Sequence, residues 1–375
     1  MRRLEQKFYA PSSPDAQRLK TQGNLEPLAV RRESDTHFLT RDGAVFLRRT
    51  EDGGGNPWLI RCQRLSTPLP WESVSISVPA TDLNLEALLA ASFGVRARID
   101  KTRSRHRAHC EGVELMVDLD EVDGLGSFVE LSADLDGDDA VPQGEAAIRT
   151  MVERLGLSGA DALPYSYADL AVMMAASVRY REQLATAGQA GKVGRMMILD
   201  GASCSGKTTL GTWLLEEAEA GLALVPRYTT RAPRPEETVS SEYIFTSPEE
   251  LHRLTNAGEL FEYRDFEFGM SYGLPWGPAV ELLTSGRDGL GIMNLGNIRH
   301  VKRVFPEAVT VLIHAPLPVI ERRLRDRGMP EGHIAERLGN ARRVESYRDF
   351  YDHVVNNDDG HLEAAQAALL GILGS

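Results

Sequence analysis

The sequence has few cysteines, no long apolar segment and no excess of positive charge. Its three cysteines, Cys62, Cys110 and Cys204, are far apart and lack paired metal-ligand spacing, so neither a disulfide framework nor a zinc site is expected. No apolar run is long enough to span a bilayer, and the opening MRRLEQKFYA lacks the apolar core of a signal peptide. The formal net charge of −12 disfavours a general binder of nucleic-acid polymers. Together these absences predict a cytoplasmic protein without membrane or nucleic-acid partners, and they leave its oligomeric state open.

A glycine-rich segment between an apolar run and a helical pattern is the clearest motif. Residues 201–208 read GASCSGKT and match the spacing G-x-x-x-x-G-K-[ST]. In this pattern backbone N–H groups surround a polyphosphate, the lysine neutralises its β and γ oxygens, and the last hydroxyl binds Mg²⁺. A chance match in a glycine turn is the alternative, but a strand expected at 196–200 and a helix expected at 207–218 favour the phosphate site. The motif predicts ATP and Mg²⁺ as cofactors, with contacts from Gly201, Ser203, Ser205, Gly206, Lys207, Thr208 and Thr209, and with Thr208 as the Mg²⁺ ligand.

The chain is long enough for two domains, since 375 residues exceed what one hydrophobic core usually organises. A glycine-rich stretch at 186–195 predicts a flexible linker between domains at 1–185 and 196–375.

The first half is β-rich, with helices expected at 83–93 and 144–155 and a third apolar segment at 167–184. Its strands are expected at 3–8, 44–49, 58–64, 73–78, 96–109, 113–120 and 127–131.

Several of these expected strands carry charge on one face. Lys101 and Arg103 share a face with two further arginines, whereas Asp118 and Asp120 share a face of the next strand. A solvated outer surface with cross-strand ion pairs is the simplest interpretation of such strands.

Several motifs in this half resemble the CYTH family of triphosphate tunnel enzymes. They are LEQKF at 4–8, DTHF at 35–38 with FLRR at 46–49, and KTR at 101–103. The segments 119–131 and 166–170 look most like the class IV adenylyl cyclase branch. The resemblance implies an antiparallel β-barrel whose basic inner residues hold a polyphosphate and whose carboxylates hold Mg²⁺ or Mn²⁺. The implied tunnel set is Glu5, Lys7, Arg48, Arg64, Lys101, Arg103, Asp118, Asp120 and Glu130, with Glu5 and Glu130 as weak metal ligands.

Two departures from that family pattern weaken the implied metal site. Arg3 stands where the family has the first glutamate of its opening motif, and Ser132 stands where it has the second glutamate after the Gly-Leu-Gly turn. Because metal affinity depends on ligand charge, we expect this half to bind a phosphorylated ligand rather than to act as a triphosphatase or cyclase.

The second half alternates strands with helices. Such a succession predicts a parallel sheet covered on both faces, with ligands at the carboxyl ends of its strands. Beyond the phosphate loop, strands are expected at 223–225, 243–245, 290–295 and 310–314, and helices at 248–255, 278–284, 298–304, 317–327, 332–347 and 361–373.

An arginine-rich loop punctuated by prolines follows the phosphate loop at 227–236. Guanidinium forks suit phosphate oxygens, and the prolines stiffen the loop that positions them. Such a loop alone is more often a solvated surface. Its place after a phosphate loop favours a site for the phosphate of a second substrate.

The second half is similar to guanylate kinase over about residues 195–374. The motifs TTRAPRP at 229–235, EYIF at 242–245, GELFEY at 258–263 and RRLRDRG at 322–328 follow in the order of that family. The resemblance implies a P-loop kinase with an α/β fold, a nucleoside-monophosphate-binding insertion and a lid. It implies acceptor contacts from Arg231, Arg234, Tyr243, Glu262 and Tyr272, an ATP-base contact from Asn357, and catalytic charge stabilisation by Lys207, Arg323, Arg327 and Arg337.

The residues that would read a guanine base depart from the family. Arg227 stands in place of a small hydroxyl residue, Leu274 in place of a serine, and Asn294 and Gly296 in place of an aspartate pair. Losing paired hydrogen-bond partners removes strict base selection. The segment 271–275 is also similar to the ribosyl bisphosphate phosphokinases, so a sugar phosphate is an alternative acceptor.

The leading hypothesis is an ATP-dependent kinase of a small phosphate ester, either a nucleoside monophosphate such as GMP or a related nucleotide or sugar phosphate. Its fused tunnel domain would bind or process a phosphorylated ligand. One alternative places the main activity in the first half, as an adenylyl cyclase or triphosphatase. Another is a nucleotide sensor in which neither half turns over, and the intact Lys207 and paired arginines argue against it.

Overall fold

The computed structural model divides into two compact units, each described by itself. Residues 1–174, 252–258 and 265–269 form the N-terminal unit, and residues 175–251, 259–264 and 270–375 form the C-terminal unit. The structure describes residues 2–10, 21, 23–40, 43–51, 57–64, 71–80, 84–137, 140–157, 161–191, 193–217, 221–233, 242–266, 270–293, 297–345 and 347–374.

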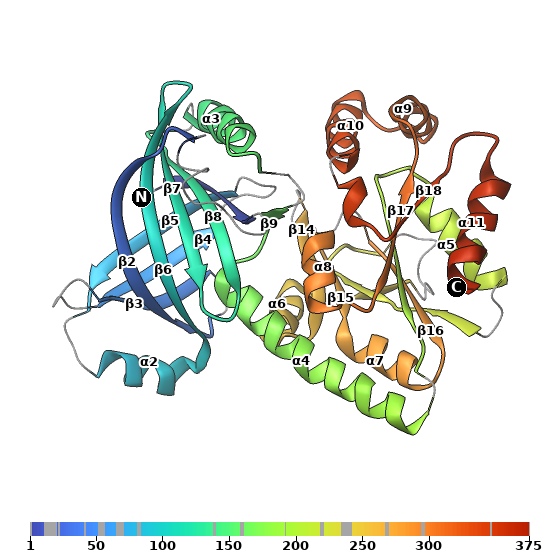
Figure 1. The fold of residues 1–375 in the computed structure, drawn as a ribbon, viewed down its shortest axis with the longest axis horizontal. Coiled ribbons are helices and arrows are strands. Elements are labelled where there is room, and N and C mark those ends of the chain that lie inside the picture. Colours follow the sequence, from blue (N-terminus) through green and yellow to red (C-terminus); the bar gives the residue numbers. More distant parts are fainter. Residues whose placement is uncertain are drawn as a thin grey trace. The chain divides into compact units, whose positions relative to one another are not determined.

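The N-terminal unit is an antiparallel sheet that closes on itself (Figure 1). The strands run in the order β5-β4-β3-β2-β6-β7-β8-β1, and β1 pairs again with β5, which closes an eight-stranded barrel. A short strand, β9 (Ala162–Leu163), pairs with Lys7 and Phe8, the part of β1 that follows its pairing with β5. The barrel strands are β1 (Arg2–Tyr9), β2 (Glu26–Phe38), β3 (Ala44–Thr50), β4 (Trp58–Arg64), β5 (Trp71–Pro79), β6 (Val95–Cys110), β7 (Val113–Val122) and β8 (Gly126–Asp134).

The alternation along the barrel strands separates an apolar face from a charged one. Leu115 and Val117 of β7 are fully buried and pack, with Ile148 of helix α3 (Val141–Arg154), into one apolar cluster. Asp118 and Asp120 point the other way and are each only 1% exposed. The charged faces are therefore buried inside the barrel, and the interpretation of these strands as a solvated outer surface is wrong.

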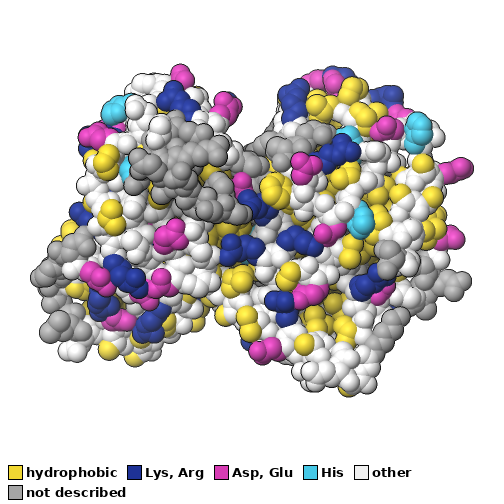
Figure 2. All heavy atoms as spheres, in the orientation of Figure 1, with side chains coloured by type: hydrophobic (Ala, Val, Ile, Leu, Met, Phe, Trp, Pro, Cys, Tyr) yellow, Lys and Arg dark blue, Asp and Glu magenta, His cyan; other side chains and the backbone are white. Residues whose placement is uncertain are grey.

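A second helix, α2 (Leu85–Phe93), covers another part of the barrel. Its residues Leu85 and Leu89 pack against the cluster of Phe38, Leu47 and Ala80. On the visible outer face of this unit, acidic and basic side chains lie interspersed (Figure 2).

Helix α4 (Tyr167–Ala190) extends into the stretch expected to be a linker. Residues 186–190 are helical, so the expectation of a flexible linker over 186–195 is wrong for its first half. The local sequence LATAGQA supplies good helix formers, and its single glycine costs only about 1 kcal/mol relative to alanine. The helix ends near Gly191, whose N–H donates to the carbonyl of Ala187 at 3.0 Å.

The C-terminal unit contains a five-stranded sheet in which every pair is parallel, as the alternating pattern predicts. Its central strand β10 (Met196–Asp200) is buried along its whole length. Helix α5 (Lys207–Glu217) packs on this sheet through Leu210 and Leu214, together with α11 (Leu362–Gly374). The strand order is β11 (Leu222–Leu224), β16 (Asp288–Ile292), β10, β17 (Val309–His314) and β18 (His353–Asn356).

A second, smaller sheet follows the order β13-β12-β15-β14. It contains Arg227–Thr229, which was expected to be loop and instead forms strand β12. The other strands are β13 (Tyr243–Phe245), β14 (Leu260–Phe266) and β15 (Met270–Pro275). The remaining helices are α6 (Pro248–Asn256), α7 (Trp276–Thr284), α8 (Ile298–Val304), α9 (Leu317–Asp326), α10 (Glu331–Glu345) and the 3₁₀ turn η6 (Arg348–Phe350).

Within the described part of the chain, no helix combines the length and apolar character needed to cross a membrane.

Candidate active site

The phosphate loop lies between β10 and α5, as its motif predicts. Gly201 and Gly206 adopt positive φ angles of 154° and 95°, a region that glycine enters without strain. A Cβ at Gly201 would lie 2.4 Å from the carbonyl oxygen of Ile313, and one at Gly206 would lie 2.1 Å from Nδ2 of Asn357. Both glycines are therefore required by the close packing of the loop against its neighbours.

Lys207 is the buried cation of this loop. Its side chain is folded onto the loop, where Nζ donates to the carbonyl oxygen of Ala202 at 3.1 Å. Burial lowers the pKa of Lys207 to about 8, and the positive charge of Arg227 acts in the same direction, whereas Asp200 opposes both. A polyanion at the loop would favour the charged form of this lysine.

Asp200, at the carboxyl end of β10, is held in place by two donors. Its Oδ1 accepts from the N–H of Gly201 at 2.7 Å, and its Oδ2 accepts from the hydroxyl of Tyr351 at 2.8 Å.

Two hydroxyl residues at the end of the motif, Thr208 and Thr209, lie exposed in the first turn of α5. The exposed Thr208 hydroxyl and the glycine-rich cradle fit a bound Mg-nucleotide.

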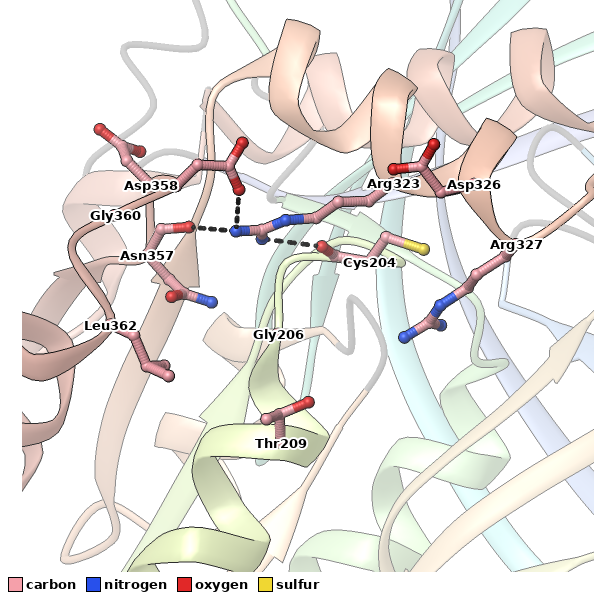
Figure 3. Close-up of a pocket in the computed structure, with 11 residues that line it drawn as sticks. Cys204, Gly206, Thr209, Arg323, Asp326, Arg327, Asn357, Asp358, Gly360 and Leu362 are labelled. Atoms are coloured by element: carbon pink, nitrogen blue, oxygen red, sulfur yellow. Dashed lines mark hydrogen bonds and ion pairs between the residues drawn. The ribbon is translucent and has the colours of Figure 1, made fainter.

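A cavity of about 460 Å³ opens beside the loop (Figure 3). It is built by three segments: the phosphate loop, the end of α9, and the residues that follow β18. Such a volume is within the range of small-molecule pockets. The lining residues are Cys204, Gly206, Thr209, Arg323, Asp326, Arg327, Asn357, Asp358, Asp359, Gly360 and Leu362.

Arg323 connects all three walls of this cavity. Its guanidinium donates to the carbonyl oxygens of Cys204 at 3.2 Å and Asn357 at 3.1 Å, and it pairs with Asp359 at 2.9 Å (Figure 3). Asn357 in turn donates from Nδ2 to the carbonyl oxygen of Ser205 at 2.7 Å. Asn357, the residue predicted to contact the ATP base, therefore lines the cavity.

The other two lid arginines lie near the same loop. Arg337 of α10 donates to Oγ of Ser203 at 3.1 Å, and Arg327 lines the cavity. The structure thus brings Lys207 and the three arginines of the predicted catalytic set to one phosphate loop.

The predicted acceptor residues gather on the smaller sheet. The Arg231 guanidinium lies 5.3 Å from the ring centroid of Tyr243, and the rings of Tyr243 and Tyr272 are 6.1 Å apart. Burial raises the pKa of Tyr243 to about 12, so its hydroxyl remains a hydrogen-bond donor at neutral pH. Arg234, the second predicted clamp arginine, lies outside the described residues.

Glu262 is almost fully buried in the same region. Burial raises its pKa to about 7, and the nearby charge of Arg227 offsets only part of this effect. Arg227 itself is 3% exposed, and its Nη2 lies 3.9 Å from Oε2 of Glu262. Leu274 is fully buried, while Asn294 and Gly296 lie outside the described residues.

The barrel interior is a second candidate site, and it holds a network of ion pairs. Arg103 contacts Asp118 at 2.9 Å, Asp120 at 2.6 Å and Glu130 at 3.2 Å. Glu130 also pairs with Lys7. Burial would raise the pKa of Glu130, but Lys7 and Arg103 outweigh it and hold the pKa well below its usual range.

A second cluster of ion pairs lies on β2, a strand that the sequence analysis did not predict. Asp35 accepts a two-pronged contact from Arg48 at 2.8 and 2.7 Å and another from Lys101 at 2.9 Å. Glu33 pairs with Lys101 at 3.1 Å. These carboxylates were not among the predicted tunnel residues, although DTHF was noted as a motif.

The structure describes the side chain of one further predicted tunnel residue, Glu5, and an unpredicted tyrosine also joins the ion-pair network. Glu5 accepts from Oγ of Ser73 at 2.9 Å, and the side chain of Arg64 lies outside the described part of the structure. Tyr167 donates from its hydroxyl to Asp120 at 2.7 Å.

The described barrel residues do not fit a divalent-metal site. Glu130 is held by two cations, and within the described ranges no group of three or more His, Cys, Asp and Glu side chains is arranged to hold a metal ion.

A parallel sheet, a phosphate loop with its lysine, and arginines from the α9–α10 segment define the C-terminal unit as a P-loop phosphotransferase. Residues 193–373 match the family model for guanylate kinase, and residues 1–167 match the model for the CYTH domain.

Two relatives of known name agree with the match of the C-terminal unit, and one solved structure is also similar to it. The chain is 39% identical to the guanylate kinase of Corynebacterium diphtheriae over 170 residues, which cover 44% of this chain and 88% of that protein. It is also 35% identical to the guanylate kinase of Synechococcus sp. over 182 residues, which cover 48% of this chain and 82% of that protein. The solved guanylate kinase of Anaplasma phagocytophilum is 24% identical, covers 49% of this chain and 86% of that chain, and gives a TM-score of 0.39.

The chain belongs to the guanylate kinase family through its C-terminal unit and carries a CYTH domain at its N-terminus. It is a guanylate kinase-like phosphotransferase.

Proposed function

We propose that the C-terminal unit transfers the γ-phosphoryl group of ATP to a phosphate monoester, either GMP or a related nucleotide or sugar phosphate. The observation that carries this proposal is the convergence of Lys207, Arg323 and Arg337 on one phosphate loop, beside a cavity of about 460 Å³. The relatives, which are named guanylate kinases, support GMP as the first acceptor to test.

The site residues act by position and charge, because in-line phosphoryl transfer needs no covalent intermediate. Lys207 holds the terminal phosphates of the donor, and Arg323, Arg327 and Arg337 stabilise negative charge that develops during transfer. Mg²⁺, when bound through Thr208, supplies further neutralisation of the phosphate oxygens.

Arg231, Tyr243 and Tyr272 bind the phosphate of the acceptor. The arginine supplies a guanidinium fork, and the two tyrosines supply hydroxyl donors. Arg234 belongs to the same clamp in the predicted site.

A panel of acceptors tests this function. The full-length protein is incubated with Mg-ATP and GMP, AMP, ribose 5-phosphate or another phosphate monoester, and ADP release and the phosphorylated product are measured. Acceptor-dependent ADP release supports a kinase, whereas a folded protein that turns over none of the panel supports the nucleotide-sensor alternative. Efficient turnover of GMP alone would show that guanine selection survives the changes at Arg227 and Leu274.

We further propose that the CYTH domain binds a phosphorylated ligand through its buried Lys7, Lys101 and Arg103. A Lys207→Met variant of the whole chain separates this role from the alternative in which the barrel is the main catalyst. The variant lacks the kinase lysine, so any remaining conversion of ATP or inorganic triphosphate belongs to the barrel. We expect none, and conversion at ordinary enzymatic rates would establish the cyclase or triphosphatase alternative.

A further inference from the structure

Arg227 is a buried cation whose Nε has no hydrogen-bond partner among the described residues. It begins β12 opposite Tyr243, and its guanidinium lies 5.1 Å from the ring centroid of Tyr272. Its carboxylate neighbour Glu262 is 3.9 Å away, which is too long for a hydrogen bond. Among the residues that the structure describes, Nε of Arg227 and Oε2 of Glu262 are both buried without a hydrogen-bond partner.

A buried guanidinium nitrogen without a hydrogen-bond partner is costly, and a ligand that supplies the missing acceptor removes this cost. Glu262 compensates Arg227 poorly because it lies too far away and because burial disfavours its ionised form. The other buried ions nearby are Lys207 and Asp200, whose charges oppose each other. Among the described charged groups that act on this region, Arg227, Lys207, Arg231 and Arg264 outnumber Asp200 and Glu242, so the net charge is positive and suits an anion.

The position of Arg227 fits the far end of the acceptor. Arg231, which we assign to the phosphate that receives the phosphoryl group, lies four residues further along the chain. Because β12 ends at Thr229, the length of four extended residues, about 13 Å, is an upper limit for the distance between the two Cα atoms. The rings of Tyr272 and Tyr243 lie between them, one beneath each guanidinium. Two long arginine side chains can close most of this distance around a small molecule.

We propose that Arg227 binds a second anionic group of the acceptor, so that the enzyme selects small molecules phosphorylated at both ends over monophosphates. This inference rests on the proposed kinase function for the identity of the acceptor end, but the subsite itself is a binding property. A guanidinium fork binds phosphate oxygens through two parallel hydrogen bonds, and an uncharged base provides weaker acceptors. Arg227 is thus assigned as the specificity-determining residue of the acceptor site.

Binding without ATP tests the subsite directly. Titration calorimetry on the full-length protein compares two pairs of probes: fructose 1,6-bisphosphate with fructose 6-phosphate, and ribulose 1,5-bisphosphate with ribulose 5-phosphate. GMP is the nucleotide reference. We expect at least one bisphosphate to bind tenfold or more tightly than its matched monophosphate and more tightly than GMP.

Variants then locate that preference. Arg227→Met should weaken bisphosphate binding at least tenfold while changing monophosphate binding less than twofold, and Arg231→Met should weaken both. Arg227→Lys keeps the charge without the fork and guards against a folding defect in the methionine variant, and it should keep part of the preference. Arg303→Met, on the exposed face of α8, is the matched control and should change neither.

The outcomes separate this inference from the kinase proposal. Equal binding of mono- and bisphosphates by the native protein overturns the subsite, even if ADP release shows an active kinase. The subsite is also overturned if Arg227→Met weakens GMP as much as the bisphosphates, since Arg227 would then be a base-reading residue. A bisphosphate preference that depends on Arg227, in a protein that phosphorylates no acceptor, upholds the subsite and refutes the kinase.

Discussion

Glu262 should make the stability of the C-terminal unit depend on pH in the neutral range. Its side chain is 1% exposed, and burial raises its pKa from 4.5 to about 7. Between these two values the folded protein keeps a proton that the unfolded chain has lost. Stability from this group therefore falls as the pH rises through that window, and it levels off above pH 7.

The size of the effect follows from the two pKa values. One pKa unit corresponds to about 1.4 kcal/mol, so a rise from 4.5 to about 7 costs about 3 kcal/mol of unfolding free energy by the end of the window. Most of this loss falls between pH 5 and 8. A Glu262→Gln variant cannot ionise, so its stability profile should lack this decline.

The assay must report on one unit of a two-unit chain. Hydrogen exchange of the β10 backbone in graded urea, at pH 5, 6, 7 and 8, measures opening of the C-terminal sheet alone. We expect native protein to lose about 2.5 kcal/mol more than Glu262→Gln over this range. Glu281→Gln, at an exposed position of α7, should follow the native profile. Parallel profiles for native protein and Glu262→Gln would refute the reasoning.

Three further predictions concern the phosphate loop and the barrel. Lys207→Met should lower acceptor-dependent ADP release by roughly 100-fold or more with unchanged β10 exchange, and activity within tenfold of native would contradict its role. Arg103→Met leaves three buried carboxylates without the cation that they share, so it should lower the unfolding free energy of the barrel by about 3–5 kcal/mol in urea unfolding. The control Arg98→Met removes an exposed ion pair and should change that free energy by less than about 1 kcal/mol. Burial alone would raise the pKa of Asp35, but its ion pairs outweigh burial and lower it, so their stabilisation is present above about pH 4 and is lost as the pH falls further. Asp35→Asn should therefore give a shallower acid-unfolding curve by circular dichroism, and an unchanged curve would count against the pair.

The barrel strands were predictable where apolar and polar residues alternate. The strand at 58–64 matches its predicted bounds, and β6 and β7 differ by at most two residues at either end. Strand β2 was missed because its sequence EPLAVRRESDTHF places charges on both faces for much of its length. Which residues of β2 face the barrel interior can be recognised only from its pairing with β6.

The candidate site was predictable where its residues are close in sequence. The phosphate loop needs only eight consecutive residues, and its form follows from backbone geometry. The partnership of Arg227 and Glu262 was not predictable, because it joins residues 35 positions apart on two strands of the small sheet. For the same reason the sequence named Lys101 and Arg103 as tunnel residues but not Glu33 and Asp35 as their partners.

The paired interior of the barrel turns anion binding into an ion exchange. A polyphosphate that takes over Arg103 or Lys101 releases carboxylates that are nearly inaccessible to water, such as Asp120 and Asp35. Each released carboxylate must then gain a proton or a counter-cation, since an isolated buried charge is too costly to leave. Ligand affinity in this unit is therefore linked to proton and cation uptake, and the barrel would bind its anion more tightly as the solution becomes more acidic or richer in small cations.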